Sequence, residues 1–289
     1  MTPHFTRFAA IDWSGAKGER QRGIAVAVCE AGKSAPELVA PPGRAWSRSE
    51  VLDWIGAQVG TSTLIGLDLS PTFPFVDRGD YFPGWRRSPG DARSLWRLVE
   101  TLSEGDSHLA ATSFVADPDA ARHFRQAGRC GDLFPPGAGR YRACELCQRA
   151  MGLSPYSCFN LVGAAQVGKS SLTGMRVLHA LSGKIPIWPF DALPARGTVI
   201  VEIYTTIAAR AAGLRKGLSK IRDAAALDEA LGELASARHA PLARYDDHST
   251  DAILSAAWLR LNAARPELWA PPGMTDDIAR TEGWTFGVR

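Results

Sequence analysis

The chain has 289 residues, of which 45% are hydrophobic and 22% are charged, and its formal net charge is +3. A chain of this size can bury a substantial core, and its modest charge decides nothing about a nucleic-acid partner. No apolar run approaches the roughly 20 residues that a membrane helix needs. The N-terminal stretch MTPHFTRFAAIDW also lacks the basic and longer apolar segments of a secretory signal. We therefore expect a cytoplasmic protein without a membrane segment.

The first part of the chain predicts three strands, a helix and a fourth strand. Ser47 and Glu50 form a capping box, which opens a helix that we expect to continue to about Gln58. The strands are apolar runs bounded by polar or turn-forming residues. They are expected at residues 8–11, 23–29, 37–40 and 64–69.

The middle section, residues 71–184, is rich in proline, glycine and arginine. Helical patterns are expected near residues 91–104 and 142–151. After it, residues 198–203 (TVIVEI) predict a strong strand, and TIAARAAG predicts a helix that ends at Gly213.

Two further helices are expected near the C-terminus. The first is a helix of mixed charge over residues 220–237. The second is a mostly apolar helix over residues 250–264, with Ser249 or Asp247 as its N-cap.

This order of elements, β-β-β-α-β-α-β-α, is typical of α/β layering and of the ribonuclease H-like fold in particular. We expect residues 1–289 to form a single domain of that class. It would have a mixed five-stranded sheet flanked by helices, and residues 71–184 would be a helical, arginine-rich insertion.

Acidic residues stand where the expected elements begin or end. Asp12, Asp68 and Glu202 lie at strand ends, and Asp251 opens the last helix. A charged side chain in an apolar strand is costly unless it is paired or binds a cation. Neighbouring strand ends converge at one edge of an open sheet, so we expect these acids to meet there. Each acid taken alone also fits a helix cap or a partner for an arginine.

Converging carboxylates suit Mg²⁺ or Mn²⁺, which take oxygen ligands. Two such ions about 4 Å apart can activate a water and stabilise the leaving oxygen of a phosphodiester. His248 and Asp247 lie three and four residues before Asp251, so either would share a helix face with it.

The segments AIDWSG, LIGLDLSP, VIVEIYTTIAARAAG and HSTDAILSAAWL resemble, in this order, an uncharacterised predicted-nuclease family with a ribonuclease H-like fold. The last segment is also similar to the closing helix of RuvC-type resolvases, where H/D-x-x-D-A carries metal ligands. The resemblance implies a metal-dependent nuclease with Asp12, Asp68 and Asp251 as ligands of Mg or Mn. Glu202 would be a further ligand or orient water, and His248 would act in the outer sphere or transfer a proton.

The resemblance covers both ends of the chain, about half its length, and leaves the insertion uninterpreted. The family pattern has proline where this chain has Thr205. The family's own activity is inferred from its fold, so the resemblance supports a nuclease by analogy.

Residues 122–149 contain six arginines against two acids, with aromatic residues among them. Arginines interleaved with aromatic rings can hold phosphates and stack bases. We therefore expect a nucleic-acid partner, DNA or RNA not being distinguished. Arg140, Arg142 and Lys169 are the candidate substrate contacts. Solvated surface arginines, or arginines that neutralise the acids, fit the same pattern.

A phosphate-loop pattern, G-x-x-x-x-G-K-[ST], is complete at Gly163, Gly168, Lys169 and Ser170. A working loop follows a strand, opens a helix and binds phosphates through its backbone and lysine. Its parallel sheet is usually built after the loop, whereas only one strong strand follows here. An ATP- or GTP-binding enzyme that uses Gly163–Ser170 is therefore an alternative to the nuclease.

Two further alternatives remain. One is a non-catalytic nucleic-acid-binding protein of the same fold. The other is a sugar-kinase-like or actin-like ATPase that uses residues 12–15, although such proteins usually carry a second, duplicated domain.

The chain has five cysteines, and Cys144 and Cys147 form a C-x-x-C pair. An odd number of cysteines without a secretory signal indicates reduced thiols. Cys130 and Cys158 would have to complete a zinc site, and their spacing matches no familiar zinc pattern. We expect ordinary buried thiols, with zinc as the alternative.

Overall fold

The computed structural model describes residues 3–137, 139–163, 166–215 and 220–289, and the structural findings below concern these residues. Five strands form one sheet in the order β3-β2-β1-β4-β7, and a separate β-hairpin pairs β5 with β6. The strands are β1 (Arg7–Asp12), β2 (Ala25–Glu30), β3 (Glu37–Leu38), β4 (Thr63–Asp68), β5 (Arg125–Gln126), β6 (Arg129–Cys130) and β7 (Val199–Glu202).

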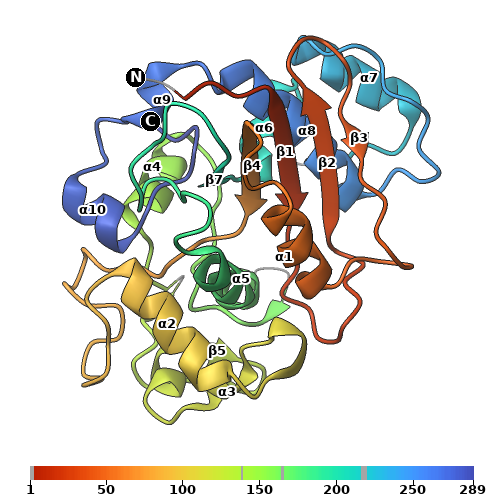
Figure 1. Cartoon of the computed structure of the whole chain (residues 1–289). Helices are drawn as coiled ribbons and strands as arrows, with labels where there is room; N and C mark the ends of the chain where they lie inside the picture. Colours follow the sequence, from red (N-terminus) through yellow and green to blue (C-terminus); the bar gives the residue numbers. More distant parts are fainter. Residues whose placement is uncertain (1–2, 138, 164–165, 216–219) are drawn as a thin grey trace.

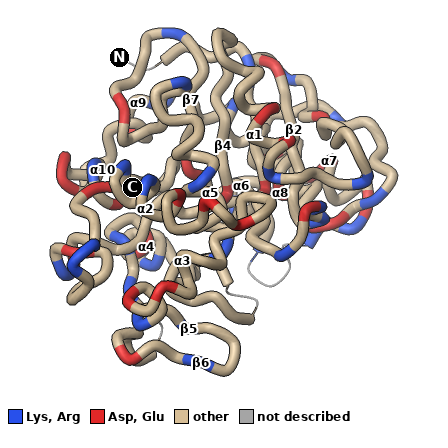
Figure 2. Tube along the Cα trace, turned by 60° about the horizontal axis from the view of Figure 1, so that its bottom comes forward, with Lys and Arg blue, Asp and Glu red and all other residues tan. Residues whose placement is uncertain are grey.

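The five-stranded sheet is mixed. Strand β1 is antiparallel to β2 and parallel to β4, and β4 is parallel to β7. The expected α/β class, with a mixed five-stranded sheet flanked by helices, is therefore confirmed (Figure 1). The parallel strands β1, β4 and β7 bring their carboxyl ends, at Asp12, Asp68 and Glu202, to the same edge of the sheet. Figure 2 shows that acidic and basic residues are otherwise spread over many elements of the chain.

Ten α-helices and two short 3₁₀ helices are named in the described part of the chain. The α-helices are α1 (Arg48–Gly56), α2 (Ala92–Ser103), α3 (Thr112–Ala116), α4 (Ala143–Ala150), α5 (Val167–Leu181), α6 (Thr205–Ala211), α7 (Ala224–Glu233), α8 (Asp247–Asn262), α9 (Pro266–Trp269) and α10 (Asp276–Thr281). The 3₁₀ helices are η1 (Ser107–Leu109) and η2 (Ala120–His123). None of the described helices is both long and apolar enough to cross a membrane.

Each face of the sheet has its own hydrophobic core. Along β1, Ala9 and Ile11 pack with α1, α2 and α5, while Phe8 and Ala10 pack with α6, α7 and α8. This alternation follows from the two-residue period of a strand. Figure 1 shows α1 and α5 in front of the sheet and α6 and α8 behind it.

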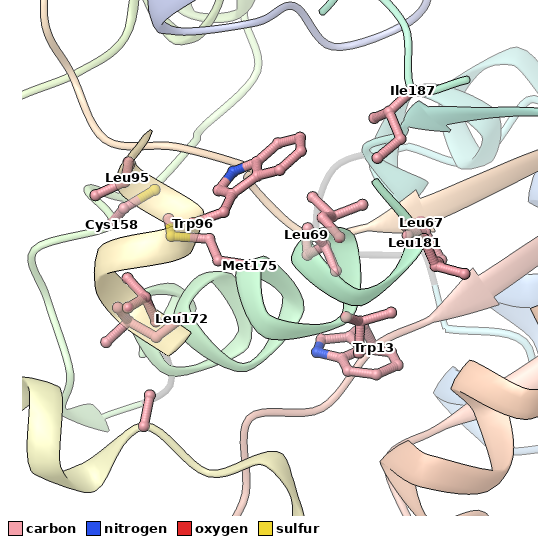
Figure 3. Packing of buried hydrophobic residues seen from close by; sticks show 14 of the residues in the cluster. Trp13, Leu67, Leu69, Leu95, Trp96, Cys158, Leu172, Met175, Leu181 and Ile187 are labelled. Carbon is pink, nitrogen blue, oxygen red and sulfur yellow. The ribbon is translucent and has the colours of Figure 1, made fainter. Parts of the chain in front are cut away.

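The segment between β4 and β7 contributes a main part of the front core. Helix α5 carries Leu172 and Met175 into the same cluster as Trp13, which follows β1, and Leu69, which follows β4 (Figure 3). The Trp13 indole N–H donates to Thr173 Oγ1 at 3.0 Å, which fixes α5 beside the end of β1. The expected insertion is therefore packed against the sheet through α5.

Several details differ from the sequence-based expectations. The N-cap of α8 is Asp246, whose side chain accepts from the Ser249 N–H, so Asp247 and His248 lie in the first helical turn. Helix α7 begins only after Asp223, its N-cap, later than expected. The C-terminal segment was not predicted to pair, yet Thr285 forms a bridge beside β7 with Glu202.

Candidate functional site

Two of the predicted acids occupy matching positions on adjacent strands. Asp12 is the last residue of β1, Asp68 is the last residue of β4, and the two are register partners in the parallel pair. Two residues before each acid, on the same strand, lies a residue that faces α8: Ala10 before Asp12, and Gly66 before Asp68. Because strand side chains alternate, both carboxylates are directed to the α8 side of the sheet.

Gly66 allows α8 to approach this sheet closely. A Cβ atom at Gly66 would lie 2.8 Å from Leu259 Cδ1 of α8 and 2.7 Å from Ile203 Cγ2. Only the absence of a side chain permits that contact. The close approach brings the first turns of α8, with His248 and Asp251, to the carboxyl end of β1.

His248 contacts the first of the two strand-end acids directly. Its Nδ1 lies 2.8 Å from Asp12 Oδ2, and its side chain is 48% exposed whereas that of Asp12 is 11% exposed. The hydrogen bond that the His248 ring donates to Asp12 raises the pKa of His248. Burial raises the pKa of Asp12 above its ordinary value, although His248 opposes that shift.

Asp68 and Asp251 complete a group that we call the acidic cluster, defined as Asp12, Asp68 and Asp251. Burial, followed by the charges of Asp12 and Asp251, raises the pKa of Asp68 well above its usual range. Burial and the charge of Asp12 raise the pKa of Asp251 to about 7. The three carboxylates thus disfavour one another's ionised forms.

Neutralising partners around the acidic cluster are few. Across the described residues, His248 is the only basic side chain within ion-pair distance of any of the three acids. Asp68 receives a hydrogen bond at 3.4 Å from Thr205 Oγ1, at the start of α6. Asp247 is instead engaged by Lys220 and Arg222, at 2.9 and 2.6 Å. Within the described residues, ionisation of these acids therefore has little compensation, in line with their raised pKa values.

The chemistry of this donor set fits a divalent cation. Three carboxylates offer hard oxygen ligands of the kind that Mg²⁺ and Mn²⁺ prefer. The positions of the side chains do not form a metal site, because no group of three or more His, Cys, Asp or Glu side chains in the described ranges could hold a metal ion as it is placed. That finding applies equally to the acidic cluster and to the zinc site considered for the cysteines.

Glu202 is placed differently from the other strand-end acids. It is the register partner of Leu67, which packs in the front core, so its side chain is directed away from the face of the acidic cluster. Arg142 Nη1 donates to Glu202 Oε2 at 2.8 Å, and Thr285 Oγ1 donates to Glu202 Oε1 at 2.7 Å. The charge of Glu202 is therefore balanced inside the protein.

The two candidate substrate arginines lie in the interior. Arg142 is fully buried and also donates from Nε to Glu145 Oε1 at 3.0 Å. Arg140 is 6% exposed and binds Asp77 together with three backbone carbonyls. These contacts give both arginines a role in holding the segment between β4 and β7 together.

A cavity of about 210 Å³ opens beside Asp68. Its wall includes three aromatic rings, from Trp13, Tyr156 and Tyr204, and the hydroxyl-bearing residue Ser170. Arg142 and Glu202 also border it. A substrate group placed there would lie next to one member of the acidic cluster.

The phosphate-loop pattern is only partly within the described residues, because residues 164–165 lie outside them. Before it, Asn160 makes only an isolated bridge with Arg125, and among the described residues between α4 and α5 no strand leads into the loop. Helix α5 begins at Val167, and Lys169 Nζ binds Gln166 Oε1 at 2.9 Å. The strand-loop-helix arrangement of a working phosphate loop is therefore not formed there.

No model of a known protein family matches this chain, and no match was found among curated proteins or solved structures. The site is therefore interpreted from its own geometry and charge.

Proposed function

We propose that this protein is a metal-dependent phosphodiesterase that cleaves nucleic acid at the acidic cluster. The observation that carries the proposal is the pairing of Asp12 with Asp68 at the ends of adjacent parallel strands, with Asp251 coupled to both by charge. One buried and two half-buried carboxylates, with His248 as their one basic ion-pair partner in the described ranges, favour a cation as their counter-charge.

Asp12, Asp68 and Asp251 would hold the cation, Mg²⁺ or Mn²⁺. Such an ion supplies Lewis acidity toward a phosphoryl oxygen and a nucleophilic water at neutral pH. The aligned strand ends fix the backbone positions of Asp12 and Asp68, since both lie within hydrogen-bonded β-structure.

His248 would act through Asp12. Its hydrogen bond to Asp12 Oδ2 orients that carboxylate, and its exposed ring can exchange protons with solvent or with a leaving group. Thr205 performs a similar positioning role for Asp68. Glu202, Arg140 and Arg142 are not needed in this account.

The proposal is tested by cleavage of labelled single-stranded and double-stranded DNA, RNA and RNA–DNA hybrids in Mn²⁺ or Mg²⁺. Asp12→Asn, Asp68→Asn and Asp251→Asn should each abolish cleavage while the protein remains folded by circular dichroism. Asp53→Asn, at an exposed aspartate of α1, is the matched control and should cleave like the wild type. Cleavage that persists in the three cluster variants would exclude this site.

A further inference from the structure

A second cavity, of about 450 Å³, adjoins the one beside Asp68. Both lie where the loop after β1 meets the first turns of α5: Trp13 and Ser170 line the first cavity, and Gly15 and Lys169 line the second. A Cβ atom at Gly15 would fall 2.3 Å from the Lys169 carbonyl carbon, so glycine is what allows this junction. The proposed function leaves the second cavity unused.

The charge of the second cavity is entirely positive. Its wall includes Lys17, Arg48 and Lys169, and none of its lining residues is an aspartate or a glutamate. Neither lysine is in an ion pair within the described residues, and Lys169 Nζ contacts only the neutral side chain of Gln166 there. The two lysine ammonium groups are therefore available to a ligand in the cavity, because no neighbouring carboxylate in the described residues pairs with them.

Arg48 is the strongest part of this pattern because it is only 1% exposed. Its guanidinium donates to the backbone oxygens of Ser14 at 3.1 Å, His108 at 2.6 Å and Ala16. No carboxylate pairs with it in the described part of the chain. Burial and the nearby Arg176 lower the pKa of Arg48 to about 10. A buried guanidinium without a counter-charge is costly, and an anion in the cavity would provide one.

The rest of the wall suits a larger ligand body than a bare anion. It is formed mainly by alanine, valine and leucine side chains, with two hydroxyls, from Thr112 and Thr173, and two amides, from Gln126 and Gln166. The volume falls within the roughly 300–1,000 Å³ that is usual for small-molecule sites. An inorganic phosphate would leave most of this space empty, whereas a base and sugar would fill it, with the amides available to the base edge.

We propose that this second cavity binds a nucleoside phosphate, with the phosphate near Lys17, Lys169 and Arg48 and the base against the apolar wall. The ligand has two possible sources, a free mononucleotide or one nucleotide of a strand that also reaches the acidic cluster. The binding mode differs from a phosphate loop, because side chains of a cavity rather than a glycine-rich backbone provide the contacts.

The test is calorimetry in EDTA with four probes: AMP, GMP, adenosine and a 5′-phosphorylated trinucleotide. EDTA removes divalent metal, so the result does not depend on cleavage or on the acidic cluster. The charge variant is Lys17→Gln with Lys169→Gln, and the volume variant is Ala116→Trp, which fills the cavity from an exposed position. The matched control is Lys184→Gln, at an exposed lysine just after α5 that does not line the cavity.

We expect at least one phosphorylated probe to bind, with its affinity weakened about tenfold or more by each test variant and unchanged by Lys184→Gln. Tighter binding of a mononucleotide than of the trinucleotide identifies a free nucleotide as the ligand. The reverse order identifies a nucleotide within a strand. The proposal is overturned if no phosphorylated probe binds, if adenosine binds as tightly as AMP, or if the test variants bind like the control.

Discussion

Asp12 and Asp68 are register partners at the ends of two neighbouring parallel strands, so two carboxylates are held side by side by backbone hydrogen bonds. Burial raises the pKa of each, and the charge of Asp12 raises that of Asp68 further. In the described residues, neither acid is paired with a lysine or an arginine. Strongly raised pKa values of neighbouring carboxyl groups are typical of sites that bind a cation or catalyse a reaction.

Asp251→Asn should stabilise the metal-free protein at neutral and higher pH. The pKa of Asp251 is about 7 in the folded protein and near the ordinary value of 3.8 when unfolded. The folded state therefore binds the proton more tightly, and the wild type loses stability as the pH rises from about 4 to about 7. The neutral amide avoids this loss, which we expect to reach roughly 2 kcal/mol.

Urea denaturation in EDTA at pH 5 and pH 8 measures this effect. The free energy of unfolding of Asp251→Asn should exceed that of the wild type by more at pH 8 than at pH 5. Asp53→Asn should show no such pH-dependent difference. An equal effect at both pH values would show that Asp251 is not the strained carboxyl inferred here.

His248→Gln should impair cleavage through Asp12 rather than through substrate binding. Loss of the 2.8 Å contact removes the group that orients Asp12 Oδ2. We expect kcat to fall by about 10²-fold with little change in KM, as for other residues that assist proton transfer. His179→Gln, near the end of α5, is the matched control. A change confined to KM would instead indicate that His248 contacts the substrate.

Arg142→Met should be strongly destabilising. The substitution leaves Glu202 and Glu145 buried without their shared cation, and breaking such a pair costs about 3–5 kcal/mol. The exposed Arg129→Met serves as the control. Adding Glu202→Gln and Glu145→Gln to Arg142→Met should recover part of the loss in urea denaturation. If Arg142→Met is as stable as the wild type, the buried network does not support the fold.

The sequence predicts much of the fold because strand and helix signals are local. The capping box at Ser47 and Glu50 is present as expected, and Asp91 caps α2 at the start of the predicted helix. Apolar runs that end at an acidic residue also indicate strand ends, so the sequence predicts Asp12 and Asp68 as candidate site residues. That Asp12 and Asp68 lie directly opposite each other depends on the register of β1 against β4, which the amino-acid composition of the strands does not determine.

The strand parity of Glu202 is visible in the sequence. Val199 and Val201 face α8, so Glu202 had to point to the opposite face from the acidic cluster. The partner that neutralises it, Arg142, lies 60 residues earlier in the chain and could not be identified from local signals. The phosphate-loop pattern is also local, and the described residues between α4 and the loop form no strand.

Calorimetric titration of Mn²⁺ into the metal-free protein tests most directly whether the acidic cluster binds a divalent cation. We predict that the wild type and Asp53→Asn bind Mn²⁺ with the same affinity, and that Asp68→Asn binds it about 100-fold more weakly, a loss of about 2.7 kcal/mol. Equal Mn²⁺ binding by Asp68→Asn and the wild type, or no binding by the wild type, would contradict the account.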